Sequence, residues 1–512
     1  MARVIIIGAG IGGLAAAALL AARGLDVTVV ERAAEIGGKM RLATIGGRAI
    51  DCGPTVFTMR WVFDELFADA GGDFAAAVAA RPVEILARHA WDDRGHLDLY
   101  PDLDRSADAI GTFCGAAEAR AYRSFSTRAA EIYRTLEHSF LRASRPSPVS
   151  LMFRVGPQRL PELLRISPFA TLWDALGEHF NDPRLRQLFG RYATYCGSSP
   201  FQAPATLMLV AHVEREGVWL VDGGMHSIAR ALATLARTHG AEIHLNAEVK
   251  EIEITRGRAT GLTLADGIRL PADAIVMNAD VAALAAGCFG AALRGAVAAV
   301  PPAARSLSAV TIANLAPCDG FPLLRHNVFF SPDYQAEFDS IFRAGRLPDD
   351  PTVYLCAQDR GDGDADVPAP GEAERLFCLI NAPPGGDTRA PAPSGETTWQ
   401  ARIAHRLAQC GLRITKWENG QWTGPREFNR LFPATGGALY GRASHGWAAT
   451  FRREAARSRL RGLYLAGGGT HPGPGVPMAA LSGRLAADAL LADLASTRES
   501  VRTAMPGGMS TP

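Results

Sequence analysis

The chain opens with the feature that most constrains its fold, a strand, a glycine-rich turn, a helix and a second strand in immediate succession. Residues 3–7 are rich in isoleucine and valine, which predicts a strand, and the Ala/Leu-rich segment after the turn predicts a helix. Between them, Gly8, Gly10 and Gly13 form a Gly-x-Gly-x-x-Gly pattern, and residues 26–31 predict the second strand. These elements make a complete βαβ unit of the dinucleotide-binding type.

Each glycine in this turn has a separate physical role. Gly8 permits the tight turn, Gly10 lets the backbone approach a pyrophosphate, and Gly13 lets the helix pack closely on the strand. The amides at the helix N-terminus then face the phosphates. Glu31 ends the second strand, where its carboxylate suits a pair of ribose hydroxyls and disfavours the 2′-phosphate of NADP. A glycine turn without a ligand is the alternative, which the strand, helix and acid together disfavour.

Two features outside this unit favour FAD over NAD. Gly38 and Lys39 belong to a second glycine-rich turn that follows Glu31 and Arg32, and a longer cofactor needs a second close approach of the backbone. Near the other end of the chain, a strand leads into the glycine-rich turn 467–475 at the start of a helix. The positive end of that helix dipole would face an electron-rich group such as a reduced flavin ring. We therefore predict FAD as the cofactor.

Composition excludes several classes of protein. The 512 residues are 48% hydrophobic, enough for several domains with substantial cores. With 53 basic and 52 acidic residues, the chain has no broad field to attract nucleic acid, so we expect no nucleic-acid partner. The eight cysteines are scattered, which predicts reduced thiols and no metal site. No signal-peptide pattern begins the chain, and residues 11–22 are too short an apolar run to span a bilayer.

The middle of the chain alternates between helical and strand patterns. Residues 60–140 are mainly helical in pattern, with a short hairpin expected near 83–100. Short strands divided by Arg-Gly and Asp-Gly turns predict a β-meander over 249–270, and a further strand follows at 274–277. Residues 301–454 mix strands and helices.

Four motifs resemble those of the FAD-dependent carotenoid and phytoene desaturases, which are relatives of the amine oxidases. They are Gly37-Gly38-Lys39, Asp51-Cys-Gly53-Pro54-Thr55, the Gly-Gly-Met turn at 223–225, and Gly-Thr-His-Pro-Gly-x-Gly at 469–475. Three further segments are most similar to the hydroxycarotenoid 3,4-desaturases, also called methoxyneurosporene dehydrogenases. These are residues 192–200, 439–441 and 474–480. The resemblance spans nearly the whole chain, with weak coverage at 60–190 and 300–430.

The resemblance implies an α/β fold with a Rossmann-type FAD-binding domain like that of glutathione reductase and the amine oxidases. It also implies an α+β substrate domain inserted into the FAD-binding domain and a helical portion that faces the membrane. The predicted FAD-binding domain comprises 1–80, 218–300 and 455–495, and the substrate domain 81–217 and 301–454, with the helical, membrane-associated part at about 105–165. The last helix is expected to end near Leu494, and residues 496–512 to form a disordered tail.

The resemblance also implies roles for residues outside the first turn. The backbone of Val249 would hold the adenine, and Asp280 would lie near the flavin together with the closing segment. The predicted cofactor-binding residues are Gly8, Gly10, Gly13, Glu31, Arg32, Gly38, Lys39, Gly53, Pro54, Thr55, Val249, Asp280, Gly467, Val476, Pro477 and Met478.

The implied reaction is the introduction of a C=C bond into an acyclic C40 carotenoid, at C3–C4 of a 1-hydroxy or 1-methoxy compound. It requires hydride loss to flavin N5 and proton loss from the neighbouring carbon. Hydride loss leaves a cation spread along the polyene, which acidifies that proton, so a strong enzymic base is not required. His471 is the candidate polar group near the ring, or alternatively a histidine that caps the helix or rigidifies the loop. Quinone or oxygen would be the electron acceptor.

A water-insoluble carotenoid must reach the site from a bilayer, so we expect a peripheral protein on the cytoplasmic face of the inner membrane. The acid-free segment 138–161, with Arg142, Arg145, Arg154 and Arg159 among apolar residues, is the predicted contact with anionic lipid. A proline-broken surface connection is the alternative. A hydroxyl on the substrate needs one buried polar partner, for which Tyr195, His212 and Glu214 are the candidates.

Other functions remain open at this point. Within the same family, the chain could be a phytoene desaturase or a carotenoid isomerase that uses reduced flavin without net oxidation. A more distant relative would oxidise an amine or a porphyrinogen. A prenyl-lipid carrier of the GDP-dissociation-inhibitor type shares the fold without redox chemistry, but the intact Glu31 and the closing turn 467–478 argue against it.

Overall fold

The computed structural model describes residues 1–92, 95–144, 147, 150, 169–361, 367–369, 371–388 and 395–503. The predicted βαβ unit is present as β1 (Arg3–Ile7), α1 (Ile11–Ala22) and β2 (Asp26–Val30). The two strands pair in parallel. Almost every residue of α1 is buried, because its run of alanines lets neighbouring helices approach from several sides.

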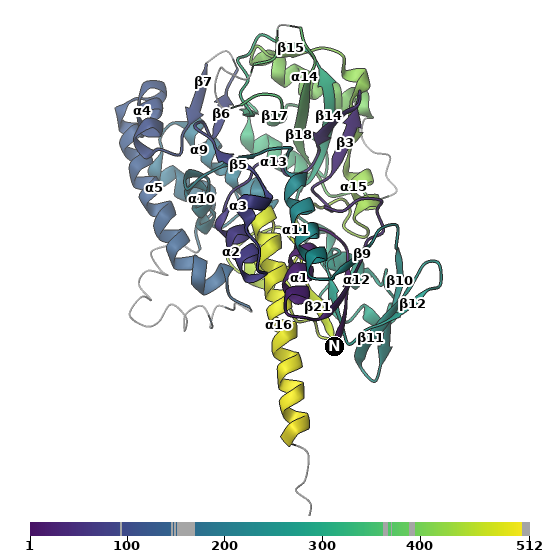
Figure 1. Ribbon diagram of the computed structural model, residues 1–512. Coiled ribbons are helices and arrows are strands. Elements are labelled where there is room, and N and C mark those ends of the chain that lie inside the picture. The colour runs from purple at the N-terminus through teal and green to yellow at the C-terminus, as the bar shows by residue number, and fades with distance from the viewer. Residues whose placement is uncertain are drawn as a thin grey trace, which may run out of the picture.

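A five-stranded sheet in the order β21-β13-β1-β2-β9 gathers strands from distant parts of the chain. All four of its pairings are parallel. The added strands are β9 (Glu242–His244), β13 (Ala274–Met277) and β21 (Leu463–Leu465). Parallel strands are buried on both faces, and both faces here are covered. Figure 1 shows segments from both ends of the chain side by side in this region.

The two faces of this sheet carry different layers. On one face Val4, Ile6 and Val29 pack with α1, α11 (His226–Thr238) and α16 (Val476–Thr503). On the other face Ile5 and Ile7 pack against the meander β10 (Val249–Thr255), β11 (Arg258–Leu264) and β12 (Arg269–Pro271). The predicted meander is therefore confirmed. It closes the face that the helices leave open.

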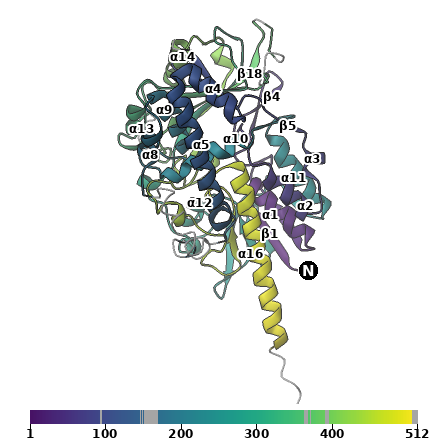
Figure 2. The ribbon, with the colours of Figure 1, turned by 90° about the vertical axis from the view of Figure 1, so that its left-hand side faces the viewer.

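The last helix is longer than predicted. We expected it to end near Leu494, but α16 continues to Thr503, so part of the predicted tail is helical. Figures 1 and 2 show its C-terminal part projecting from the body of the molecule. Residues 504–512 of the predicted tail lie outside the described residues. Among the helices that are described, none is both long enough and apolar enough to cross a membrane.

A second sheet of seven strands has the order β20-β14-β18-β17-β16-β6-β7. Only the pairing of β16 with β6 is parallel. The predicted hairpin near 83–100 is confirmed as β6 and β7. The strands are β6 (Ala87–Ala90), β7 (His96–Leu99), β14 (Ser308–Ala316), β16 (His326–Phe329), β17 (Val353–Ala357), β18 (Glu374–Ala382) and β20 (Gln421–Thr423).

The second sheet is also covered on both faces. Helix α14 (Glu396–Gln409) covers one face through Trp399 and Ile403. The hairpin of β3 (Leu42–Ile45) and β4 (Arg48–Asp51) covers part of the other, where Ile50 and Cys52 meet Phe377. This hairpin, which the sequence did not predict, carries the Asp51–Thr55 motif against the second sheet.

Helices fill the remaining side of the molecule (Figure 1). Their core is aromatic, with Phe125, Phe180 and Phe189 in mutual contact. The helical pattern predicted over 60–140 is present in α2 to α5. The elements outside the two sheets and their covering layers are α2 (Trp61–Asp69), α3 (Phe74–Ala77), β5 (Ala80–Pro82), α4 (Leu103–Cys114), α5 (Ala116–Leu136), a π-helical turn (Glu137–Leu141), α8 (Leu172–His179), α9 (Pro183–Gly190), α10 (Leu209–Arg215), β8 (Trp219–Val221), α12 (Val281–Ala286), β15 (Cys318–Asp319), α13 (Tyr334–Phe342), β19 (Arg413–Ile414) and α15 (Pro425–Leu431).

A buried acid on α13 makes the stability of this fold dependent on pH. Glu337 is 1% exposed, accepts hydrogen bonds from Thr352 and Asn381, and has its pKa raised by burial to about 7. The folded state therefore binds more protons than the unfolded state between the ordinary glutamate pKa and about 7, and stability falls as pH rises through that range.

We predict that Glu337→Gln removes this dependence. For the wild-type protein, titration of this group should lower the free energy of unfolding by roughly 2–3 kcal/mol between pH 5 and pH 8. The melting temperature should fall accordingly. The variant should show a smaller fall, as measured by thermal unfolding of the flavin-loaded protein at both pH values. An equal fall in both proteins would show that the Glu337 carboxyl does not titrate in this range.

Candidate active site

Several predicted cofactor residues follow the C-terminal ends of parallel strands in the five-stranded sheet. Gly8 follows β1, Glu31 follows β2, Asp280 lies three residues after β13, and Gly467 lies two residues after β21. Because the carboxyl ends of parallel strands meet at one edge of a sheet, these four residues gather there. Ligands of open α/β sheets bind at this edge.

The first glycine turn has the geometry that its sequence predicts. Gly8 has a φ of +99°, which favours glycine. A Cβ on Gly13 would lie 2.2 Å from the carbonyl oxygen of Gly8, so only glycine fits where α1 meets the turn. Gly10 faces the second glycine turn, since a Cβ on Gly38 would lie 3.1 Å from the Gly10 Cα. The two predicted glycine turns therefore face each other.

Glu31 and Arg32 differ in where their side chains go. The Glu31 carboxylate accepts hydrogen bonds from the backbone N–H groups of Ala9 and Ala33, both at 2.8 Å. Each oxygen can accept a further bond, as ribose hydroxyls would require. Arg32, by contrast, donates to the carbonyl oxygens of Arg430 and Leu431 at the end of α15. Its guanidinium is thus held by the neighbouring helix.

Val249 and Asp280 lie near the C-terminal ends of two different strands, β2 and β13. Val249 begins β10 and belongs to the same apolar cluster as Val30 at the end of β2. Asp280 caps α12 by accepting a hydrogen bond from Ala282 at 3.0 Å. A Cβ on Gly469 would lie 3.3 Å from the Asp280 carboxylate. The closing turn therefore rests directly beside Asp280.

Lys39 lies deep in the protein, where the motifs meet. Its ammonium donates to the carbonyl oxygen of Leu439. Burial lowers its pKa, while the nearby Asp280 opposes this and Arg453 adds to it. A Cβ on Gly53 would lie 2.0 Å from the Lys39 carbonyl oxygen, so the turn at Gly53, Pro54 and Thr55 packs against the second glycine turn.

Two of the three segments that resemble hydroxycarotenoid desaturases are joined by hydrogen bonds. Leu307 links them, because its N–H donates to Gly197 at 2.9 Å and its carbonyl accepts from Leu439 at 3.0 Å. The hydroxyl of Ser198 accepts from the N–H of Ser444 at 2.8 Å. Segments 192–200 and 439–441 thus form one wall of the site, which the sequence alone could not establish.

Thr55 is tied to the second sheet through a residue that the sequence analysis missed. Its hydroxyl lies 2.7 Å from that of Tyr354 on β17, which lies 2.8 Å from Nδ1 of His326 on β16. Tyr354 falls in the part of the chain where motif coverage is weak. Only the packing of the β3–β4 hairpin on the second sheet brings it to the Gly-Pro-Thr turn.

Of the three candidate partners for a substrate hydroxyl, the structure brings two together. The Tyr195 hydroxyl donates to Glu214 at 2.6 Å, and that of Tyr192 donates to the same carboxylate at 2.7 Å. Burial raises the pKa of Glu214. His212 points elsewhere, with its ring 5.0 Å from that of Tyr133 and its Nδ1 3.6 Å from Glu216. His212 is therefore separate from the pair.

His471 is held by packing. Its backbone N–H donates to Glu454 at 2.8 Å, and its ring, 3% exposed, meets Phe140 edge-to-face at 5.0 Å. Phe140 also packs on Phe451. These contacts favour the alternative stated for His471, a residue that rigidifies the closing turn.

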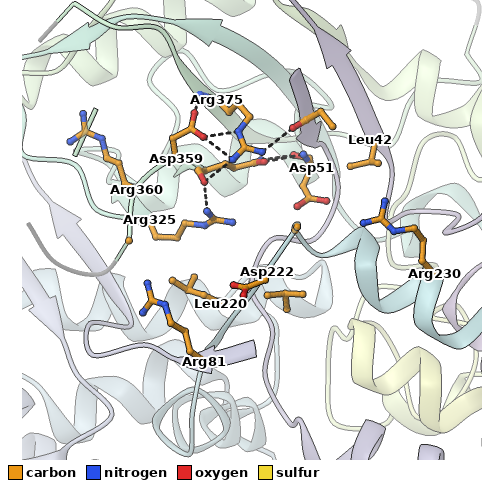
Figure 3. A pocket seen from close by; sticks show the side chains of 16 residues that line it. Leu42, Asp51, Arg81, Leu220, Asp222, Arg230, Arg325, Asp359, Arg360 and Arg375 are labelled. Atoms are coloured by element: carbon orange, nitrogen blue, oxygen red, sulfur yellow. Dashed lines mark hydrogen bonds and ion pairs between the residues drawn. The ribbon is translucent and has the colours of Figure 1, made fainter. Parts of the chain in front are cut away.

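A polar cavity of about 330 Å³ lies next to this site but has the wrong chemistry for an apolar chain. Asp51 and Arg325 lie at its centre and Arg81 and Arg230 at its rim, while Arg375 pairs with Asp359 (Figure 3). The Asp51 carboxylate accepts from the Met225 N–H at 2.9 Å, which fixes the start of α11. The cavity therefore offers charges that a hydrocarbon cannot pair.

The arrangement fits FAD. The Gly8–Gly13 turn presents the N-terminal amides of α1 to a pyrophosphate, and Glu31 presents free acceptor positions for ribose hydroxyls. The closing turn and the start of α16 reach the same edge beside Asp280. Lys39, which forms no ion pair with a carboxylate among the described residues, supplies a cation where an electron-rich group would lie.

Comparison with known proteins agrees with this geometry. Residues 11–318 match the model of the flavin-containing amine oxidoreductases, and residues 179–489 match that of the FAD-dependent oxidoreductases. A hydroxyneurosporene desaturase of Rubrivivax gelatinosus is 52% identical over 99% of this chain and 97% of its own. The chain belongs to the FAD-dependent carotenoid desaturase family. It is a flavoprotein oxidoreductase, and FAD is its cofactor.

Further relatives agree with this family assignment, and a solved structure shares the fold. Hydroxyneurosporene desaturases of Cereibacter sphaeroides and Rhodobacter capsulatus are 44% and 43% identical, each over 96% of this chain and 98% of theirs. Among solved structures, cyclohexylamine oxidase of Brevibacterium oxydans matches with a TM-score of 0.57 and 18% identity, covering 96% of this chain and 99% of the other. At that identity the likeness concerns the fold alone.

We predict that Gly13→Ala weakens retention of FAD, because the new Cβ would collide with the Gly8 carbonyl and displace the turn. The dissociation constant for FAD should rise at least about tenfold, which corresponds to 1.4 kcal/mol. The flavin-to-protein absorbance ratio after purification measures this. Gly295→Ala is the control, since a Cβ there meets nothing within 4 Å. A Gly13→Ala variant that purifies with full FAD would contradict the assignment.

Proposed function

We propose that this desaturase forms the C3–C4 double bond of an acyclic carotenoid that carries oxygen at C1. The observation that carries the proposal is the similarity, over nearly the full length, to three hydroxyneurosporene desaturases. The segments that resemble this group, 192–200 and 439–441, are joined by hydrogen bonds through Leu307, which supports the proposal. Phytoene desaturase, a more distant alternative, is represented by a Fusarium fujikuroi relative at 30% identity.

FAD, when bound, accepts the hydride that the substrate loses. The chain positions the substrate and excludes water. Tyr354 fixes the Gly53–Thr55 turn through the Thr55 hydroxyl, and Phe140 and His471 close the side next to the closing turn. Because the cation left on the polyene acidifies the adjacent proton, positioning in an apolar site is the main requirement on the protein.

We predict that the flavin-loaded protein converts hydroxyneurosporene in liposomes to a product lighter by two hydrogens with a longer-wavelength absorption spectrum. Quinone or oxygen is supplied as the electron acceptor, and product mass and spectrum are measured. A product of unchanged mass would instead indicate an isomerase. Oxidation of an amine without any change in carotenoids would indicate an amine-oxidase relative.

We further propose a membrane contact at the aromatic pair Phe169 and Trp447, on the cytoplasmic face of the inner membrane. These side chains are 71% and 46% exposed and meet edge-to-face at 5.6 Å, although they are far apart in sequence. Arg452, in the short 3-10 helix that follows Trp447 in the sequence, is also exposed. Exposed aromatic residues with a cation a few positions away suit the interface of an anionic bilayer.

This location differs from the one expected at segment 138–161. Arg142 is engaged within the protein, because it pairs with Glu65 and Glu137 and stacks over Trp61 at 4.0 Å. These contacts make Arg142 less available to lipid, and a membrane contact through segment 138–161 stays a prediction. Arg145, Arg154 and Arg159 lie outside the described residues.

We predict that replacing Phe169 and Trp447 together by serine weakens binding to anionic liposomes by about tenfold or more, since each buries apolar surface in the bilayer. Co-sedimentation with liposomes measures this. Ile268→Ser is the matched control, because Ile268 is 54% exposed on the β-meander. Equal binding by all three proteins would rule out the aromatic pair as the contact.

A further inference from the structure

We infer that Tyr195 and Arg191, held by Glu214, form a subsite for the oxygen at the end of the carotenoid. This inference rests on the proposed function and deepens it, because it names the residues that distinguish an oxygenated end from a hydrocarbon one. Arg191 was not among the sequence candidates. It begins the helical turn that contains Tyr195.

The hydrogen bonds within this group fix its geometry. One Arg191 guanidinium N–H donates to the Tyr195 hydroxyl oxygen at 3.1 Å, and that hydroxyl donates its own proton to Glu214 at 2.6 Å. The second oxygen of Glu214 accepts from Tyr192 at 2.7 Å. Tyr195 is therefore fixed from both sides, with its proton committed to the carboxylate.

What remains unused on these side chains defines the ligand. The Tyr195 oxygen can accept one more hydrogen bond, and among the described residues Arg191 makes only one side-chain hydrogen bond, so further N–H donors remain. A hydroxyl can donate to Tyr195 and accept from Arg191 at once, whereas an ether can only accept. A hydrocarbon end would leave the remaining Arg191 N–H donors without an acceptor.

The group lies deep in the protein but still faces internal space. Tyr195 and Arg191 keep partial solvent-accessible surface despite dense surrounding protein, and so do Cys196, Tyr354 and Tyr440. Tyr192, by contrast, is only 4% exposed and belongs to the aromatic core of the helices. Of the two phenols on Glu214, Tyr195 therefore has the surface that a ligand could reach.

The subsite also lies close to the Gly53–Thr55 turn, which is predicted to bind the cofactor. Oxygen at C1 is only a few bonds from the C3–C4 bond, so the proposal requires its partner to lie near the predicted flavin site. The Arg191 guanidinium lies over the rings of Tyr195 and Tyr354, at 5.2 Å and 5.5 Å. Tyr354 in turn lies 2.7 Å from the hydroxyl of Thr55. The contact of Arg191 with Tyr354 and that of Tyr354 with Thr55 thus connect the subsite to the Gly-Pro-Thr turn.

The test compares Tyr195→Phe with Tyr192→Phe. Both changes remove one phenol hydrogen bond to Glu214, so the effect of losing that bond is present in both, whereas Tyr195→Phe also removes the acceptor for Arg191. Only Tyr195→Phe removes a group that faces the ligand. We expect it to lower kcat/KM for hydroxyneurosporene by about 10- to 100-fold while kcat/KM for neurosporene, which lacks the hydroxyl, changes little. Tyr192→Phe should keep the wild-type ratio of the two values.

Binding is measured alongside turnover, by titrating each flavin-loaded protein with both carotenoids in detergent and following the carotenoid absorption. A preference for the hydroxylated compound that is lost in Tyr195→Phe supports the subsite even if no desaturation occurs, in which case the proposed reaction alone is overturned. Desaturation with an unchanged preference in Tyr195→Phe overturns the subsite and leaves the reaction standing. Equal loss of preference in both variants also overturns it, since the effect would then be structural.

Discussion

The parallel pairing of β1 with β2 and β13, and of β13 with β21, is the interaction on which the rest of the structure depends. It places the ends of four strands at one edge of the sheet, although the strands come from the beginning, middle and end of the chain. The second sheet and the helices occupy the intervals between these strands in the sequence. The active site therefore exists only when the whole chain is folded.

Much of the cofactor half could be predicted because its signals are local. The βαβ unit, the meander and the strand before the closing turn each follow from a short run of residues. The order of the seven-stranded sheet could not be predicted, because β6 and β7 join strands more than two hundred residues away. Such pairing depends on tertiary packing, which leaves no local pattern.

The candidate site divides in the same way. The glycine turns and Glu31 were found because their residue types and spacing have a direct chemical meaning. Tyr354 and Arg191 were missed, since a tyrosine in a strand or an arginine after a helix is ordinary in sequence. The separation of His212 from the pair has the same cause, because it is only two positions from Glu214 on α10 but packs against Tyr133. Direction around a helix, rather than closeness in sequence, decides which side chains meet.

A buried charge in a site for a hydrocarbon needs a physical reason. Placing Arg191 and Glu214 in the interior carries a desolvation penalty that their attraction only partly offsets, and well-packed apolar residues would often be as stable. The phenols of Tyr192 and Tyr195 reduce the penalty by satisfying the carboxylate, but they do not satisfy the remaining donors of Arg191. An oxygen atom on the substrate would do so. The same desolvation that makes this group unfavourable without a ligand would make it selective, because a hydrocarbon end leaves the penalty in place and a hydroxyl reduces it.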